Sequence, residues 1–254
     1  MNFKISSSFR KLTKNDAGFT LVELMIALVI TGIIIASMYM AYLSQQKTYL
    51  VQEQVAEMQQ NLRAGMAILA YDLRMAGYDG GNGTRHASCS LGAGGAATQP
   101  GVLAATATQL DFSMDLNQDG DCADAGENLT YTLYTTNAGV QALGRRDNSG
   151  GAAIQAVAEP FDGVEFLYKD MTGSPTTILA DIRSVQISLL ARASKIDRKY
   201  LVTKYYCPAS NPLNPATGQC TQTNPASATI WGPYSDGYRR RLLIAEINCR
   251  NMGL

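Results

Sequence analysis

An uncharged span near the start of the chain limits what this sequence can fold into. No acidic or basic residue occurs between Leu24 and Gln46, and most residues in the span are apolar. As a helix, these roughly 23 residues would extend about 35 Å, enough to cross a bilayer core about 30 Å thick. The span therefore predicts a membrane helix, and the simplest interpretation is an anchor that holds a domain to a membrane.

One carboxylate stands directly before this span. The six residues Gly18–Glu23 read GFTLVE, and Glu23 is the last charge before the apolar run. A carboxylate within a membrane costs about 2.5–3.5 kcal/mol, so a partner cation is expected. An ordinary secretory signal is cut after its apolar region, whereas this pattern lies before it. The helix is therefore expected to remain in the mature protein.

The sequence GFTLVE resembles the processing site of class III signal peptides, found in type IV pilins and type II secretion pseudopilins. The resemblance implies that a prepilin peptidase cuts between Gly18 and Phe19 on the cytoplasmic side and methylates Phe19. It also implies that Glu23 pairs with the N-terminal amine of a neighbouring subunit. A plain signal anchor that keeps Met1 is the alternative.

Residues 1–18 are then a leader that is removed. They carry Lys4, Arg10, Lys11 and Lys14 against Asp16. Positive flanks stay cytoplasmic, so the C-terminal bulk is expected to be exported. The resemblance to pilins implies a single-pass inner-membrane protein with its head in the periplasm, and later a place in a fibre at the cell surface.

The helical pattern continues beyond the uncharged span. Apolar residues recur every three or four positions, which marks one face of a helix, at Val51, Val55, Met58, Leu62, Met66, Leu69 and Leu73. The other face carries Gln52, Glu53, Glu57, Gln60 and Arg63. With Gly77 as a stop signal, the sequence predicts one helix over 19–77, about 88 Å long. About 19–43 would span the membrane, and the second half would pack on a head formed by 78–254.

The head is predicted to be rich in β-strands. A glycine-rich loop over 77–101, which contains the only histidine, His86, leads into seven segments with strand patterns: 109–114, 129–134, 140–143, 154–158, 164–168, 185–189 and 239–248. In the last segment Leu242, Ile244 and Ile247 are expected to contact the core. The predicted fold class is α+β, a pilin-like long helix packed on an antiparallel sheet.

Four segments of the lower half resemble the PilW family of minor type IV pilins: Phe161–Tyr168, Asp181–Arg192, Tyr238–Arg241 and Asn248–Asn251. The resemblance implies a minor pilin that helps to initiate pilus assembly with other minor pilins and is incorporated near the tip. Its implied partners are the prepilin peptidase, the major pilin, the inner-membrane assembly platform and a tip adhesin.

An acidic loop is a candidate calcium site. Residues 115–121 read DLNQDGD, which fits the start of a calcium loop, in which alternate side chains supply oxygens and a glycine allows a sharp turn. The expected ligands are the side chains of Asp115, Asn117, Asp119 and Glu127 and the carbonyl of Asp121. The twelfth position is Gly126 rather than glutamate. A solvated acidic loop without calcium is therefore the alternative.

Five cysteines follow the membrane span, so disulfides are allowed in an exported head and at least one thiol stays outside an intramolecular pair. Cys207 and Cys220 bracket a proline-rich loop that a disulfide would constrain. Cys89 and Cys122 form a second candidate pair, which leaves Cys249.

The remaining patterns narrow the function classes. No nucleophile motif or phosphate loop occurs, which argues against an enzyme. Net charge is zero, so no basic field favours nucleic acid. Arg239–Arg241 form a small basic cluster, but a strand splits it between two faces, so solvated or ion-paired charges are expected rather than a nucleic-acid site. A type II secretion pseudopilin and a membrane-anchored adhesin or binding module are the alternatives to a minor pilin.

Overall fold

The computed structural model describes residues 18–80, 89, 101–200, 203–214, 216–217, 219–220 and 231–252. Residues 1–17 of the leader, His86 and most of the glycine-rich stretch lie outside the described residues.

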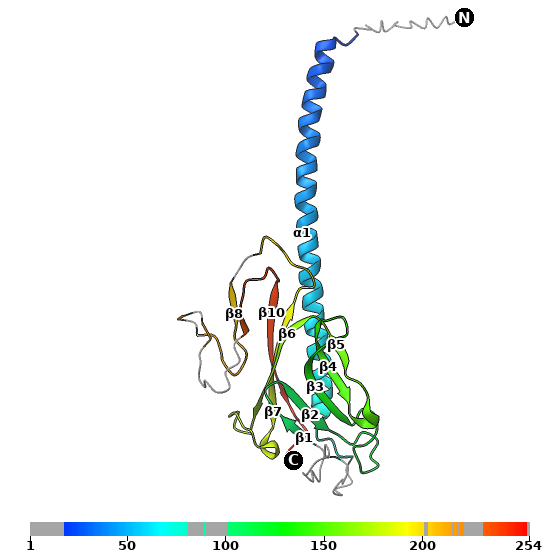
Figure 1. The fold of residues 1–254 in the computed structure, drawn as a ribbon, viewed down its shortest axis with the longest axis vertical. Helices are drawn as coiled ribbons and strands as arrows, with labels where there is room; N and C mark the ends of the chain where they lie inside the picture. The colour runs from blue at the N-terminus through cyan, green and yellow to red at the C-terminus, as the bar shows by residue number, and fades with distance from the viewer. Residues whose placement is uncertain are drawn as a thin grey trace, which may run out of the picture. The chain divides into compact units, whose positions relative to one another are not determined.

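Leu21–Met75 form one α-helix of 55 residues, α1 (Figure 1). It begins directly after Thr20, whose Oγ1 accepts a hydrogen bond from the backbone N–H of Glu23 (3.2 Å). It ends before Gly77, which has φ +76°. This left-handed conformation suits the residue that follows a helix, and glycine adopts it without the steric cost that other residues meet.

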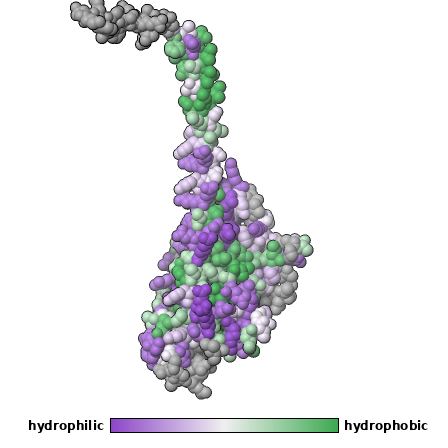
Figure 2. All heavy atoms as spheres, turned by 180° about the vertical axis from the view of Figure 1, so that it is seen from behind, coloured by the Kyte–Doolittle hydropathy of each residue, from purple (hydrophilic) through white to green (hydrophobic). Residues whose placement is uncertain are grey.

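The chain divides into two compact units, Met1–Leu50 and Val51–Leu254, and α1 contributes to both. In the first unit the helical residues 21–50 are exposed, except for the half-buried Leu43. Figure 2 shows the N-terminal part of the helix as a mostly hydrophobic surface. The helix is long and apolar enough to cross a membrane.

In the second unit, α1 buries one face in the head. The expected apolar stripe is confirmed, because Met58, Leu62, Met66, Leu69 and Leu73 are all buried. The predicted polar face is exposed. These side chains share one hydrophobic core with residues from two β-sheets.

The first sheet has five strands in the order β1-β2-β3-β4-β5, and every pair is antiparallel. Its strands are β1 (Val102–Ala105), β2 (Gln109–Ser113), β3 (Asn128–Thr135), β4 (Gln141–Asp147) and β5 (Gln155–Ala158). A short 3-10 helix, Ser149–Gly151, precedes β5. The order follows the chain, so each strand pairs with its successor through a turn or loop.

The second sheet has three strands in the order β10-β7-β6, again antiparallel. They are β6 (Phe161–Lys169), β7 (Ser184–Arg192) and β10 (Arg240–Asn248), and the 3-10 helix Leu179–Asp181 lies before β7. A separate antiparallel pair consists of β8 (Lys204–Tyr206) and β9 (Trp231–Tyr234). The predicted α+β fold, one long N-terminal helix followed by an antiparallel β-sheet head, is confirmed.

The β8–β9 pair covers part of the second sheet. Tyr206 and Trp231 form a small apolar cluster with Leu190, and Leu242 packs against it. A Cβ atom on Gly163 would lie 2.4 Å from the Trp231 ring, so the close approach of this ring requires a glycine. The strand patterns predicted seven strands, and they missed β1, β8 and β9, which have three or four residues each.

One prediction about the core is wrong. Ile244 was expected inside but is 39 % exposed. Side chains of a strand alternate between its faces, and in β10 the face with Ile247 also carries Leu243 and Ala245, which pack on the core. Ile244 therefore lies on the opposite face, together with Leu242.

Candidate functional site

The predicted processing site lies just outside the start of α1. Gly18, Phe19 and Thr20 are not helical, and Phe19 is 88 % exposed. The bond between Gly18 and Phe19 is therefore in irregular, exposed backbone, the kind of segment that a peptidase can bind in extended form.

Glu23 lies in the first turn of α1 and forms a capping box with Thr20. The Thr20 hydroxyl accepts from the Glu23 backbone N–H, and the Glu23 carboxylate accepts from the backbone N–H of Thr20 (3.4 Å). The sequence analysis did not identify this role, although T-x-x-E before an apolar run is a known signal for it. The negative charge of Glu23 also interacts favourably with the positive end of the helix dipole.

The Glu23 side chain nevertheless remains accessible to another molecule. It is exposed, and within the described part of the chain its hydrogen bonds go to Thr20 alone. The capping box fixes its direction, and the carboxylate keeps its capacity to accept from an external cation.

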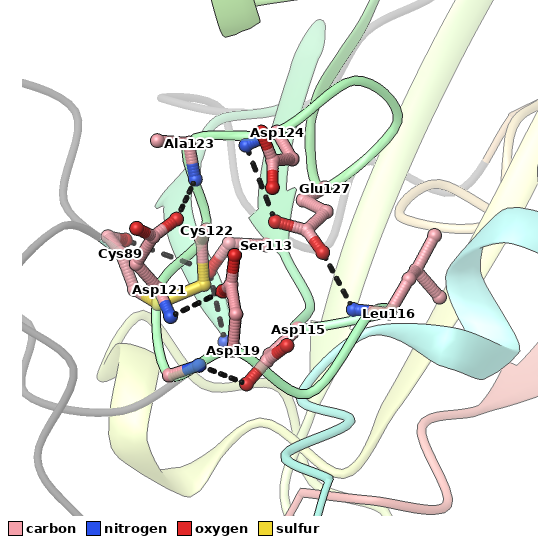
Figure 3. Close-up of a disulfide and its surroundings, with 12 residues drawn as sticks. Cys89, Ser113, Asp115, Leu116, Asp119, Asp121, Cys122, Ala123, Asp124 and Glu127 are labelled. Carbon is pink, nitrogen blue, oxygen red and sulfur yellow. Dashed lines mark hydrogen bonds between the residues drawn. A yellow bond between two sulfur atoms is a disulfide. The ribbon is translucent and has the colours of Figure 1, made fainter.

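In the acidic loop, two of the expected calcium ligands bind the backbone of the loop itself (Figure 3). Buried Asp115 accepts from the N–H groups of Gln118 (2.7 Å) and Gly120 (3.1 Å). Buried Glu127 accepts from the N–H groups of Leu116 (2.8 Å) and Asn117 (3.2 Å). These carboxylates order the loop.

Three other carboxylates of this loop lie close together. One oxygen from each of Asp119, Asp121 and Asp124 can be chosen so that all lie within 4.8 Å of one another. Asn117 links two of them, because its side-chain amide donates to Asp119 (2.9 Å) and Asp124 (2.6 Å). The Asn117 amide and the Asp121 N–H lower the pKa of Asp119, because both stabilise its charged form. Asp124 was not among the expected ligands.

Both cysteine pairs considered from the sequence are disulfides in the structure. One disulfide links Cys89 to Cys122 in the acidic loop (Figure 3). The other, Cys207–Cys220, closes the proline-rich loop. Cys249 is a free, buried thiol. Burial raises the pKa of Cys249 to about 12, so the thiol stays protonated at neutral pH.

A buried polar network joins the head half of α1 to the first sheet. The carboxylate of Asp72 accepts from the Tyr131 hydroxyl (2.6 Å) and from the Arg145 guanidinium (2.7 Å). Burial, together with the neighbouring Asp72 charge, raises the pKa of Tyr131. The sequence analysis did not predict this network.

The basic cluster at the start of β10 is largely ion-paired, as expected. Arg239 pairs with Asp197 (2.8 Å), and Arg240 pairs with both Asp162 and Asp236. Arg240 lowers the pKa of Asp236 to about 2 by hydrogen bonding to its charged form. Arg241, the third member of the cluster, is exposed and has no ion-pair partner among the described carboxylates.

Residues 13–39 match the family described as the prokaryotic N-terminal methylation motif. None of the curated protein sequences matches the chain. Among solved structures, the chain is similar to a type IV-like pilin from Thermus thermophilus, at 15% identity and a TM-score of 0.43, over 77% of this chain and 98% of that one.

The methylation motif coincides with the site built above. It contains Gly18, Phe19 and Glu23, and it extends into the exposed apolar part of α1. The chain therefore carries a prepilin-type N-terminal methylation motif at the start of a long helix, followed by an antiparallel β-sheet head.

Proposed function

We propose that the protein is a minor pilin of the PilW family, which helps to initiate type IV pilus assembly and is incorporated in the fibre near its tip. The observation that carries the proposal is the methylation motif at residues 13–39, which ends within an apolar helix whose residues 21–50 are almost all exposed. Such a helix needs lipid or sister helices around it.

The position of the PilW-like segments supports the finer assignment. Phe161–Tyr168 fall on β6, Asp181–Arg192 lead into β7, and Tyr238–Arg241 lead into β10. Three segments far apart in the sequence thus form one sheet, as expected if they belong to one structural unit of the family.

In the proposed mechanism, the prepilin peptidase removes residues 1–18 and methylates Phe19. The helix then spans the inner membrane over about 19–43, with the head, 78–254, in the periplasm. Glu23 pairs with the N-terminal amine of a neighbouring subunit, either another minor pilin or the major pilin, at the assembly platform. Helix packing replaces lipid contacts, so the process requires no catalytic group in this chain.

A clean deletion strain tests this function. We expect loss of surface pili, counted by shearing and microscopy, with normal secretion of enzymes by the type II system, and restoration by the intact gene. N-terminal sequencing of the restored protein should begin at methylated Phe19. Lost secretion with normal pili would instead identify a type II pseudopilin. An N-terminus at Met1 with pili intact would point to a membrane-anchored adhesin or binding module.

We also propose that the acidic loop binds calcium weakly through Asp119, Asp121 and Asp124. The closeness of their carboxylates supports this, and the solvated ligands suggest an affinity in the range of extracellular sites, about 10⁻⁴–10⁻³ M. Asp115 and Glu127 would then support the loop from its interior through the backbone bonds described above.

Thermal unfolding of the full chain in detergent tests the calcium proposal. At 10 mM calcium, a site with Kd about 1 mM adds about 1.4 kcal/mol, which corresponds to roughly 3–6 °C in Tm. Asp124→Ala should abolish this shift, whereas Asp181→Ala, at an exposed acid in the 3-10 helix before β7, should keep it. An unchanged Tm at 10 mM calcium would end the proposal.

A further inference from the structure

The outer edge of β10 is a row of unpaired backbone groups. The β10–β7 ladder runs without a register shift from Arg240 opposite Arg192 to Asn248 opposite Ser184. Beyond the two ends of β10, the Ala193 N–H donates to the Arg239 carbonyl (2.8 Å) and the Cys249 N–H donates to the Arg183 carbonyl (2.9 Å).

These two end bonds determine which residues of β10 have backbone N–H and C=O groups that point away from β7. Antiparallel ladders alternate between hydrogen-bonded and non-hydrogen-bonded pairs, so the odd-numbered residues of β10 bond to β7. The N–H and C=O groups of Leu242, Ile244 and Glu246 therefore point away from the sheet. The Tyr206 hydroxyl donates to the outward carbonyl of Arg240 (3.3 Å), which agrees with this assignment.

Beyond Arg240, no other backbone group in the described ranges pairs with this edge. The β8–β9 pair packs against the sheet, where Tyr206 and Trp231 contact Leu190, and among the described strands it forms no ladder with β10. The edge is therefore open from Leu242 to Glu246 within the described residues.

Proteins normally protect strand edges by shortening them, by bulges, by proline or by charged side chains. The first sheet follows this rule, since its edge strands β1 and β5 have four residues each and both pair through irregular registers. In contrast, β10 has nine residues, no proline and a regular register, and it carries the 39 % exposed Ile244 on its outer face. The charged residues of β10 are Arg240, Arg241 and Glu246, so its central residues Leu242–Ala245 carry no charge. Such an edge favours the addition of another strand.

A cleft of about 480 Å³ adjoins the start of this edge. It is lined chiefly by residues of β8, β10 and the disulfide-closed loop, including Lys204, Tyr205, Tyr206, Leu213, Arg241 and Leu242. Lys204 and Arg241 are exposed, and neither forms an ion pair with any described carboxylate. Their neighbours Arg239 and Arg240 are both paired. The cleft thus combines apolar walls with two unneutralised positive charges.

We propose that the edge of β10 binds an extended segment of another protein as a fourth strand, with an acidic end of that segment in the cleft beside Lys204 and Arg241. Backbone pairing with Leu242, Ile244 and Glu246 supplies the register, and the two cations select a partner with carboxylates at one end. The site is separate from fibre formation by the N-terminal helix, so either proposal can fail without the other.

Binding of synthetic peptides to the full chain in detergent tests the site. The probes are labelled peptides of alternating Thr and Val, with two glutamates at either end, and matched peptides with two lysines. Of the two acidic peptides, one with glutamates at its N-terminus and one with them at its C-terminus, we expect one to bind at least tenfold more tightly than the peptide with lysines at the same end. Fluorescence anisotropy measures the affinities. Reversing the charges with Lys204→Glu and Arg241→Glu should invert the preference. Equal binding of both peptides would overturn the charged part of the site.

Ile244→Pro tests strand addition itself. Proline removes an outward N–H that β7 does not use, so the ladder within the sheet can remain. We expect at least tenfold weaker peptide binding, whereas Ile244→Ala, which keeps the N–H, should bind within threefold of wild type. Undiminished binding by a folded Ile244→Pro variant would overturn the proposal, and if that variant does not fold, the charge reversal above decides the outcome.

A photo-crosslinker at Tyr205 of the full chain, in cells that assemble pili, identifies the natural occupant. An adduct with a different protein that disappears in Ile244→Pro and persists in Ile244→Ala is the expected result. An adduct with a second copy of this chain, or one that is insensitive to Ile244→Pro, would contradict the proposed partner.

Discussion

Glu23→Ala is expected to leave cleavage after Gly18 intact and to reduce incorporation into fibres by at least about a hundredfold. In the assembled fibre the proposed partner of this carboxylate is the amine of a neighbouring subunit, in apolar surroundings. Removing one member of a buried ion pair costs about 3–5 kcal/mol because the other charge is left unpaired, and 3 kcal/mol corresponds to a factor above one hundred.

The capping box makes a second explanation testable. If Glu23 mattered only as a cap, Gln would replace it, because glutamine also serves at this position of a capping box. Under the ion-pair account, Glu23→Gln should fail as severely as Glu23→Ala. Thr20→Ala is the matched control, since it removes the cap at a cost of about 1 kcal/mol and keeps the carboxylate. We expect incorporation of Thr20→Ala within a few-fold of wild type.

The measurement compares sheared fibres with whole cells by immunoblotting, together with N-terminal mass spectrometry of the cellular pool. The mass spectrum separates a processing defect from an assembly defect in each variant. Normal incorporation of Glu23→Gln, or loss in Thr20→Ala equal to that in Glu23→Ala, would assign Glu23 to helix capping and remove the ion pair from the mechanism.

The helix and the longer strands could be predicted from the sequence because their signals are local. The stripe from Met58 to Leu73 repeats at the period of a helix, and β7 alternates apolar residues at Val185, Ile187 and Leu189. The wrong placement of Ile244 in the core also comes from relying on a local pattern. Apolar residues occur on both faces of β10, and only the register with β7 shows which face meets the core.

The acidic loop shows what the spacing of residues cannot predict. The order of residues from Asp115 to Glu127 predicts that oxygens converge, but it does not say on what. In the structure the two outermost carboxylates converge on backbone N–H groups of the loop, and the cluster at its exposed side includes Asp124, which no template position indicated. Backbone N–H groups and a cation compete for the same carboxylate oxygens, and the spacing of the residues does not show which of them binds.

The network around Asp72 lay beyond prediction for another reason. Its partners Tyr131 and Arg145 are 59 and 73 residues away, on neighbouring strands of a sheet whose position on the helix is a tertiary property. In the sequence, Asp72 is one polar residue beside an apolar stripe, which usually indicates a solvated position. In the structure it is 9 % exposed.

Because Asp72 is buried, we expect Asp72→Ala to lower the stability of the unit Val51–Leu254 strongly. The substitution leaves the Tyr131 hydroxyl and the Arg145 guanidinium without their shared acceptor. Loss of one partner from a buried pair costs about 3–5 kcal/mol. The Arg145 side chain is 32 % exposed and can regain water, so we expect the lower end, about 3 kcal/mol. For a chain of this size that lowers Tm by roughly 6–12 °C.

A double-mutant cycle separates the network from simple loss of packing. Tyr131→Phe removes one hydrogen bond and should cost about 1 kcal/mol in the wild type, but almost nothing in the Asp72→Ala background, where the acceptor is already gone. Arg63→Ala, on the exposed face of the same helix, is the control and should change stability by less than about 0.5 kcal/mol. Unfolding of the full chain in detergent, followed by near-UV circular dichroism, gives these free energies.

Additive effects of Asp72→Ala and Tyr131→Phe would show that the two side chains act independently. Coupling near 1 kcal/mol would show that the head is held to its helix by this buried contact as well as by apolar packing.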